Sequence, residues 1–353
     1  MSAGAGEVAG AATGAVVGKA VGTAGSAAAG RPTDAAAGPA QTCPGPPSDV
    51  CQALALARRL GLDRIDAQWL LAHLLQTPRT WLISHGDAPL AEPVAQAFAD
   101  ACRRCADGEP LAYLLGEQEF HGLRLQVTPD VLVPRPDTET LVDWALALLS
   151  AWLPARLPAL SPIPVPTLAP VPRGRQPQVL DLGTGSGAIA LAVAHRHPGA
   201  HVSATDISRA ALTVAQRNAV RLGLVIEWSL GDWWQALAAG DSIRQFDLAL
   251  CNPPYIAGDD PHLPALQHEP LAALTPGGDG LGALQAVICG APAHLVPGGW
   301  LLLEHGWDQA PAVTSALRAA GFESISTRHD IAGRPRCSGG CLPLARAWTP
   351  APA

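Results

Sequence analysis

The chain has 353 residues, of which 48% are hydrophobic and 15% are charged, and its formal net charge is -7. A chain of this length can bury the cores of about two domains, and its net acidity argues against a protein that grips long nucleic acids through their phosphates. No apolar run reaches the length of a membrane span and the N-terminus lacks the pattern of a signal peptide, so we expect a cytoplasmic protein.

The first part of the chain contains two contrasting compositions. Residues 1–47 are rich in Ala and Gly with almost no large apolar side chain, so burial cannot offset their ordering entropy and we predict a disordered extension. From Ser48 and Asp49, a suitable helix cap, apolar residues recur at helical spacing. This pattern predicts a small helical domain over 48–108.

The cysteines do not favour a metal site. Cys102 and Cys105 form a C-x-x-C pattern inside a predicted helix, and Cys337 and Cys341 form a looser pair. No neighbouring His completes either pair at the spacing that zinc sites use. We therefore expect no bound metal, and unpaired thiols in a reducing, intracellular setting.

Residues 109–153 are predicted to connect the helical domain to the rest of the chain through a hairpin and a helix over 140–152. Two interpretations of Arg135 and Glu139, which precede that helix, stay open. The two side chains either face an active cleft or belong to a plain connection. The next stretch, 154–177, is rich in Pro without periodicity, which predicts an exposed, extended insert.

From Gln178 onward, apolar runs of strand length alternate with helical patterns, which predicts a parallel sheet with helical crossovers in a domain over 178–353. The predicted strands are 179–182, 201–205, 225–230, 246–251, 300–304, 322–328 and 342–348.

A glycine-rich turn follows the first predicted strand of this sheet and opens a helix. It consists of Gly183, Thr184, Gly185, Ser186 and Gly187. Glycines at such a turn permit positive φ and let a ligand approach the backbone. An acidic residue, Asp206, ends the next strand about 20 to 25 residues later, where nucleoside-binding folds place a carboxylate on the ribose hydroxyls.

Two further residues bear on which nucleoside is bound. Asp181, just before the glycine turn, would repel a pyrophosphate but suit a cationic amino group. The sequence therefore favours S-adenosylmethionine over NAD. Trp233, after the third strand, offers an apolar wall for the adenine, although it can instead be a core residue beside Trp234.

The run Asn252, Pro253, Pro254 and Tyr255 follows a predicted buried strand, 246–251. Two prolines cannot continue a ladder, so the chain leaves the sheet at Asn252 in a nearly fixed geometry. An Asn side chain both donates and accepts, the prolines expose carbonyls, and Tyr255 can lie against a flat group. Such a site can hold a planar nitrogen and direct its lone pair; an ordinary Pro-rich turn is the alternative.

From about Ser48 to Trp348 the chain resembles the bacterial release-factor glutamine methyltransferases, which are class I S-adenosylmethionine-dependent enzymes. The linker motifs are the more specific part of the resemblance, because Asn-Pro-Pro-Tyr alone is shared with adenine-N6 DNA and guanine-N2 rRNA methyltransferases. The matching motifs are 110–116, 134–139, 181–187, 252–255, 268–270, 278–281 and 303–304. Departures are the N-terminal extension, the Pro-rich insert and the Cys-containing segment before the last predicted strand.

The resemblance implies an α/β protein in which a class I methyltransferase (Rossmann-like) sheet follows a small helical substrate-recognition domain and a β-hairpin linker. It implies that Gly183–Gly187, Asp206, Trp233 and Asn252 bind S-adenosylmethionine. It implies that Asn252–Tyr255 hold the glutamine of the Gly-Gly-Gln loop of peptide-chain release factors, with catalysis by Asn252, Pro253 and Tyr255. We expect a monomer that binds neither membrane nor nucleic acid.

Two other functions stay open on sequence alone. A nucleic-acid amino methyltransferase, acting on adenine-N6 or guanine-N2, would be expected to carry a basic recognition region with aromatic residues. A nucleoside-binding regulatory module would leave the rigid Asn252–Tyr255 run without a purpose. No general base is evident near that run, although Glu304 and His305 end a strand on the same edge of the sheet.

Overall fold

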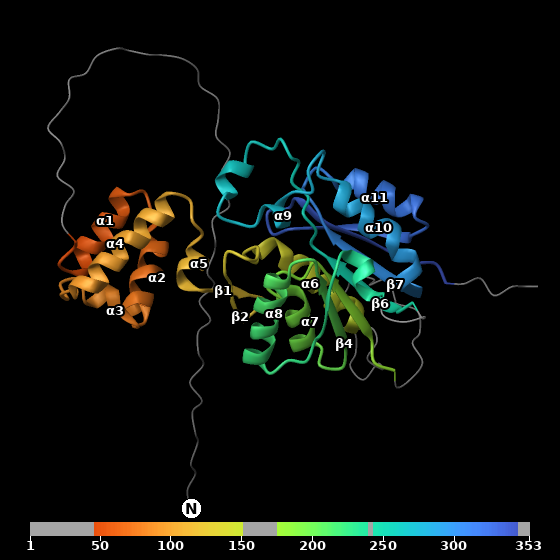
Figure 1. Ribbon diagram of the computed structural model, residues 1–353, viewed down its shortest axis with the longest axis horizontal. Coiled ribbons are helices and arrows are strands. Elements are labelled where there is room, and N and C mark those ends of the chain that lie inside the picture. The colour runs from red at the N-terminus through yellow and green to blue at the C-terminus, as the bar shows by residue number, and fades with distance from the viewer. Residues whose placement is uncertain (1–45, 151–174, 239–242, 345–353) are drawn as a thin grey trace, which may run out of the picture. The chain divides into compact units, whose positions relative to one another are not determined.

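The computed structural model describes residues 46–150, 175–238 and 243–344. Almost all of the predicted extension and most of the Pro-rich insert lie outside these residues. Within the described part, helices surround a central sheet and form a separate helical group near the start (Figure 1). No helix of this described part is long and apolar enough to cross a membrane.

The N-terminal helical group has its own core. Asp49 and Asp63 cap its first two helices by accepting hydrogen bonds from the backbone N–H groups of Gln52 and Ile65. Val50, Leu71 and Phe98 are fully buried where the helices meet. The helices are α1 (Val50–Arg59), α2 (Arg64–Leu75), α3 (Arg79–Ser84), α4 (Glu92–Ala106) and α5 (Leu111–Leu115).

A β-hairpin follows this group, as the sequence predicts. Strands β1 (Glu117–Phe120) and β2 (Leu123–Gln126) pair antiparallel through a two-residue turn, His121–Gly122, with φ of 49° and 79°. Two positive φ values match the turn to the right-handed twist of the strands. The buried Asn218 of α8 (Arg209–Leu222) accepts from Gln126 N at 2.6 Å and donates to Ser186 O at 3.0 Å. One side chain thus joins the hairpin to the glycine turn.

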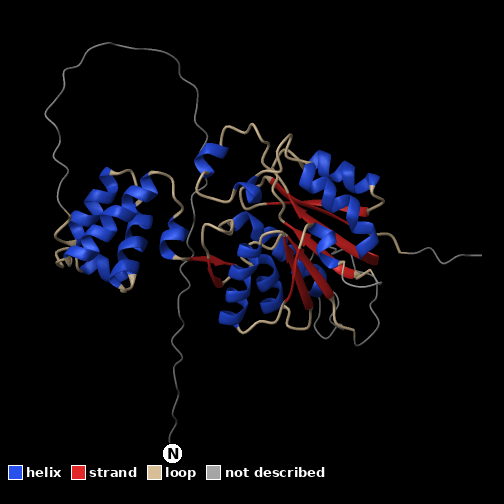
Figure 2. Ribbon diagram, viewed as in Figure 1, coloured by secondary structure: helices blue, strands red, loops and turns tan. Residues whose placement is uncertain are grey.

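The central sheet, whose strands are red in Figure 2, has its seven strands in the order β5-β4-β3-β6-β7-β9-β8 among the described residues, and β9 runs antiparallel to the other six. Successive connections leave β3 in opposite directions, so the strand order reverses between β3 and β6, where ligands bind in open α/β sheets. The strands are β3 (Gln178–Leu182), β4 (His201–Asp206), β5 (Glu227–Leu230), β6 (Phe246–Cys251), β7 (Leu295–Glu304), β8 (Glu323–His329) and β9 (Pro335–Cys341).

Helices cover both faces of the sheet (Figure 1). Side chains of β6 alternate between two cores: Leu248 and Leu250 face one, and Ala249 and Cys251 face the other. The first core lies under α6 (Glu139–Ser150), α7 (Ala188–Arg196) and α8, and the second under η2 (Trp233–Leu237), α10 (Gly282–His294) and α11 (Ala310–Ala319). This layered α/β architecture confirms the predicted fold class.

The last strand of the described residues is Pro335–Cys341, a segment that the sequence does not predict as a strand. Of the predicted strand 342–348, residues 342–344 are not in a strand and the rest lie outside the described residues. The sequence of Pro335–Cys341 lacks the apolar alternation of a strand, and two of its residues are glycine. A Cβ on Gly339 would lie 2.5 Å from Leu302 Cδ2 and 3.0 Å from Trp144 Cη2. Trp144 of α6 packs directly on this strand, so glycine here reflects close packing rather than a turn.

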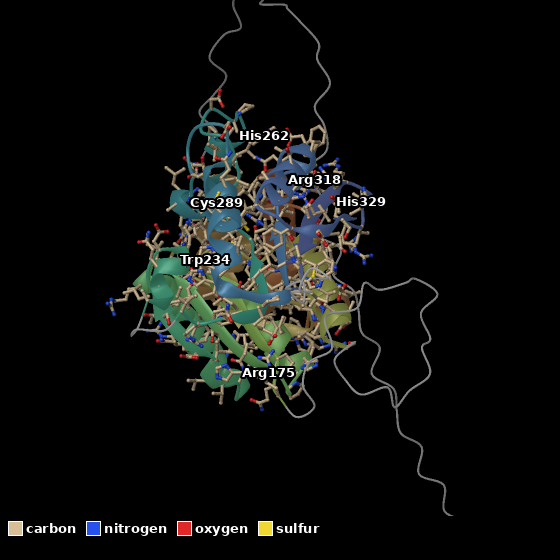
Figure 3. All side chains as sticks on the ribbon, turned by 90° about the vertical axis from the view of Figure 1, so that its right-hand side faces the viewer. Arg175, Trp234, His262, Cys289, Arg318 and His329 are labelled. Carbon is tan, nitrogen blue, oxygen red and sulfur yellow. The ribbon has the colours of Figure 1, made fainter. Side chains whose placement is uncertain are left out.

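Gly290 in the middle of α10 faces a similar constraint, because an added Cβ would lie 2.2 Å from Trp234 Cδ1. Figure 3 shows Trp234 next to this helix, which also carries Cys289, and Trp234 Nε1 donates to Val287 O at 2.9 Å. We expect Gly290→Ala to lower the free energy of unfolding by about 1–3 kcal/mol through overpacking. Urea unfolding measures this loss.

The matched control for Gly290→Ala is Gly282→Ala at the start of the same helix, where an added Cβ meets nothing within 4 Å. The control should be neutral or stabilising by up to about 1 kcal/mol, because alanine favours a helix. Equal effects of the two substitutions would show that the contact with Trp234 does not limit the size of the side chain at position 290.

Candidate functional site

A cavity of about 240 Å³ opens at the carboxyl edge of the sheet. Its lining residues come from six segments, which lie far apart in the sequence: 130–138, the glycine turn with the start of α7, 205–211, 231–233, 252–254 and 270–273. The cavity therefore lies at the point where the strand order reverses, as expected for a ligand site in this architecture.

The glycine turn forms one wall of the cavity. Gly183, Thr184, Gly185 and Ser186 line it, whereas Gly187 lies behind them against α8. Gly183 has φ of 71°, and an added Cβ would lie 3.2 Å from the ring of Trp233. Only glycine therefore lets the backbone and the Trp233 ring approach this closely.

Asp206, at the end of β4, lines the cavity and is 9% exposed. Its Oδ2 accepts from Gly185 N and its Oδ1 accepts from Ser208 N, both at 2.8 Å. Burial raises the pKa of this carboxyl, and the backbone N–H groups oppose that rise. Each oxygen keeps a further lone pair for a ligand hydroxyl.

Asp181 does not line the cavity, in contrast to the expected contact with a cationic group. Its side chain is fully buried beneath the glycine turn, where Oδ2 accepts from Thr184 Oγ1 at 2.6 Å and from Ala190 N at 3.2 Å. Burial raises the pKa of Asp181 to about 7. Asp181 thus links the glycine turn to the start of α7 through these two hydrogen bonds.

Trp233 lines the cavity, while the adjacent Trp234 is buried in the core. The backbone of Trp233 has φ of 39°, which is uncommon for a bulky residue and costs on the order of 1 kcal/mol or more. Gly231 precedes it, and a Cβ there would lie 2.8 Å from Ala236 Cα. The loop is therefore held in a conformation that turns the Trp233 ring toward the glycine turn.

The Asn252–Tyr255 run begins at the cavity and ends behind it. Asn252 and Pro254 line the cavity, and Asn252 Nδ2 donates to Thr138 Oγ1 at 3.2 Å. Pro253 and Tyr255 are not among the lining residues. The Tyr255 hydroxyl donates to Glu304 Oε1 at 3.2 Å, so this ring supports the loop.

A further wall of the cavity comes from residues 130–135 and 270–273, of which the sequence suggests only Arg135 for an active cleft. Arg135 lines the cavity and forms an ion pair with the buried Glu269, whose Oε2 also accepts from Val133 N at 3.1 Å. Glu139, the other candidate in this segment, accepts from His121 N at 2.9 Å and is not a lining residue. The motif 268–270 was the available signal, because it supplies Glu269.

Glu304, at the end of β7, is 1% exposed, and burial raises the pKa of its carboxyl to about 7. A carboxyl with a raised pKa stabilises the fold below its unfolded pKa, near 4.5, and this contribution is lost as pH rises through about 7. We therefore compare the free energy of unfolding of Glu304→Gln with that of the unsubstituted protein. The difference, variant minus unsubstituted, should rise by about 3 kcal/mol between about pH 4 and about pH 8.

Urea unfolding at several pH values measures this difference, with the exposed Glu323→Gln of β8 as the matched control. If the free energy of unfolding of Glu304→Gln instead falls relative to that of the unsubstituted protein as pH rises, the fold stabilises the Glu304 carboxyl in its charged form.

The cysteines of the predicted C-x-x-C pattern lie on α4. Burial raises the pKa of Cys102 to about 12 and that of Cys105 to about 11. Both thiols thus stay protonated near neutral pH.

Comparison with known proteins gives consistent matches over most of the chain. The family profile of the PrmC N-terminal domain matches residues 51–116, and that of the Methyltransferase small domain matches 165–279. Release factor glutamine methyltransferase of Bordetella pertussis is 46% identical over 80% of this chain and 96% of its own length. The protein of the same name from Xylella fastidiosa is 43% identical over 84% of this chain and 99% of its own length.

Among solved structures, a protein-(glutamine-N5) methyltransferase (release factor-specific) from Alicyclobacillus acidocaldarius is 26% identical. The match covers 62% of this chain and 99% of that chain, with a TM-score of 0.34.

Proposed function

The chain belongs to the family of release factor glutamine methyltransferases, and we propose that it methylates the side-chain nitrogen of the glutamine in the Gly-Gly-Gln loop of peptide-chain release factors. The methyl donor in this proposal is S-adenosylmethionine. The observation that carries the proposal is one cavity shared by the glycine turn, Asp206 and Asn252. A nucleoside and a carboxamide can therefore lie side by side.

The cavity residues fit the adenine and the ribose of S-adenosylmethionine. Trp233 and Ile207 offer apolar surface to an adenine, and the Asp206 carboxylate lies at the strand end where it can accept from ribose hydroxyls. An added Cβ at Gly185 would meet nothing within 4 Å, so open space adjoins the backbone there. When bound, S-adenosylmethionine supplies an electrophilic methyl group on a sulfonium.

Asn252 is proposed to hold the substrate carboxamide. An amide nitrogen is a poor nucleophile because its lone pair is delocalised. Hydrogen bonds from its two N–H groups to Asn252 Oδ1 and to the Pro253 carbonyl would favour pyramidal character and fix the attack direction. Both oxygens then face the positive charge that develops on nitrogen as the methyl group arrives. The nitrogen loses this charge when it releases one of its two protons to water, so catalysis rests on positioning and electrostatics.

The surrounding residues hold this arrangement in place. The Arg135–Glu269 ion pair links the segment before α6 to the segment before α9 (Leu271–Leu274), and residues of both segments line the cavity. Tyr255 is placed behind the loop by its bond to Glu304, so we propose that it supports the substrate-binding residues from there.

A transfer assay with labelled S-adenosylmethionine tests the proposed function. The substrates are a release factor, the same factor with the Gly-Gly-Gln glutamine replaced by alanine, and single-stranded RNA and DNA. We expect label only in the unaltered release factor. Label in the nucleic acids instead would favour the adenine-N6 or guanine-N2 reaction, and binding of the donor without any transfer would favour a regulatory module.

A further inference from the structure

A group of buried polar side chains adjoins Asn252, and one of them, Thr138, also lines the cavity. Asn252 Nδ2 donates to Thr138 Oγ1 at 3.2 Å, and Thr138 is 4% exposed. The carboxyl of Glu304 lies next to it: the Thr138 hydroxyl is close enough to lower the pKa of Glu304. Glu304 Oε1 accepts from the Tyr255 hydroxyl, whereas Oε2 has no hydrogen-bond partner among the described residues.

The direction of these hydrogen bonds determines which end of the Asn252 amide faces the cavity. A threonine hydroxyl has one proton, and it accepts freely only when that proton points at another acceptor. If the proton points at the Glu304 carboxylate, Thr138 must accept from Asn252, and Oδ1 faces the cavity. If the hydroxyl instead donates to Asn252, the amide turns over and presents its NH₂ to the substrate NH₂, which leaves two donors facing each other.

We propose that Thr138 and Glu304 are positioning residues that hold the Asn252 amide with its oxygen toward the substrate nitrogen. The inference rests on the proposed function, because it concerns the same glutamine site. Thr138 and Glu304 act through Asn252 in this account. A buried carboxylate costs stability, and the need for a hydrogen-bond acceptor of fixed polarity gives a reason for one to lie here.

Several charged or titratable groups face Glu304 and affect its ionisation. Arg336 of β9 lowers the pKa of Glu304, while Asp137 of η1 (Pro136–Thr138) raises it. Arg336 itself pairs with Asp137 at 3.1 Å and with Asp330 at 3.3 Å. The other neighbouring groups are Tyr255 on the loop after β6, Cys251 of β6, Cys337 of β9 and His305 after β7.

The carboxyl can direct the Thr138 proton only when it is ionised. The pKa of Glu304 is raised by burial to about 7, so its charged fraction falls as pH decreases through that value. We therefore expect kcat to fall on the acid side of about pH 7.

Removal of the Thr138 hydroxyl tests the inference directly. Thr138→Val keeps the shape of the side chain but cannot accept from Asn252, so kcat should fall about 10- to 100-fold, with the KM for S-adenosylmethionine changed less than about 3-fold. Thr138→Ser restores the hydroxyl and should recover kcat to within about 5-fold. Thr213→Val, an exposed position on α8, is the matched control.

Glu304→Gln supplies the pH readout. This variant removes the titrating group, so its kcat should be low. Its kcat should also be nearly independent of pH over the range in which the kcat of the unsubstituted enzyme rises with pH. Thermal unfolding of each variant separates loss of fold from loss of positioning. If Thr138→Val is unfolded, the Ser and Gln variants still test the inference.

Three results would overturn the inference. They are an unchanged kcat in Thr138→Val, a loss confined to the KM for S-adenosylmethionine, and an acid limb that persists in Glu304→Gln. Failure of the proposed function gives a different result, because the unsubstituted enzyme would then transfer no methyl group to the release factor at any pH.

Discussion

Asn252→Ala should reduce kcat for methyl transfer to a release factor by about 1,000-fold, the loss typical when one preorganised polar group of an active site is removed. Asn252 lies at the cavity edge of β6 with its amide held by Thr138, so its oxygen is fixed before substrate binds. The affinity for S-adenosylhomocysteine should change less than about 5-fold, because Asp206 and Trp233 provide the nucleoside contacts in our account.

Single-turnover kinetics measures the transfer step, and isothermal titration measures the affinity. Gln216→Ala, at an exposed position of α8, is the control for loss of an amide side chain. Transfer by Asn252→Ala at the rate of the control would remove Asn252 from the mechanism. A large loss of affinity with unchanged kcat would make Asn252 a cofactor-binding residue only.

Asp206→Ala should weaken binding of S-adenosylhomocysteine by about 100-fold or more. The carboxylate can accept two hydroxyl hydrogen bonds, and bonds to a charged group contribute about 1.5–3 kcal/mol each. The change also removes the carboxylate oxygen that accepts the hydrogen bond of Gly185 N at 2.8 Å, so the glycine turn is held less firmly. We therefore expect the loss of affinity and a change in the conformation of the glycine turn to occur together.

Isothermal titration of Asp206→Ala and Asp206→Asn separates these two effects. The asparagine keeps one acceptor oxygen, so it should bind the ligand more tightly than the alanine variant does. An affinity within about 3-fold of the unsubstituted protein in both variants would contradict the placement of the ribose at Asp206.

The sequence predicts the fold well where local patterns decide it. The six-residue strand before Asn252 is apolar except for Asp247 because both faces are buried, and its predicted bounds are those of β6. Ser208 caps α8 as expected for its side chain. By contrast, Pro335–Cys341 forms a central strand with almost no strand pattern, because close packing of Trp144 and Leu302 requires glycine there.

The parts of the site that sequence reasoning could not predict depend on contacts between distant segments. Arg135 pairs with Glu269 and Asn252 binds Thr138 across more than a hundred residues, and no local period signals either contact. For Asp181, by contrast, the sequence predicts a contact with the ligand, although this residue does not line the cavity. A carboxylate at a strand end suggests ligand contact, yet only the packing of α7 shows that this one is enclosed beneath the turn.

The most direct test of the account is a crystal structure with S-adenosylhomocysteine and a peptide that contains Gly-Gly-Gln. We predict that the glutamine side-chain nitrogen lies about 3 Å from Asn252 Oδ1 and faces the sulfur, with the nucleoside between Asp206 and Trp233. A glutamine bound outside the cavity, or a nucleoside away from the glycine turn, would contradict the account.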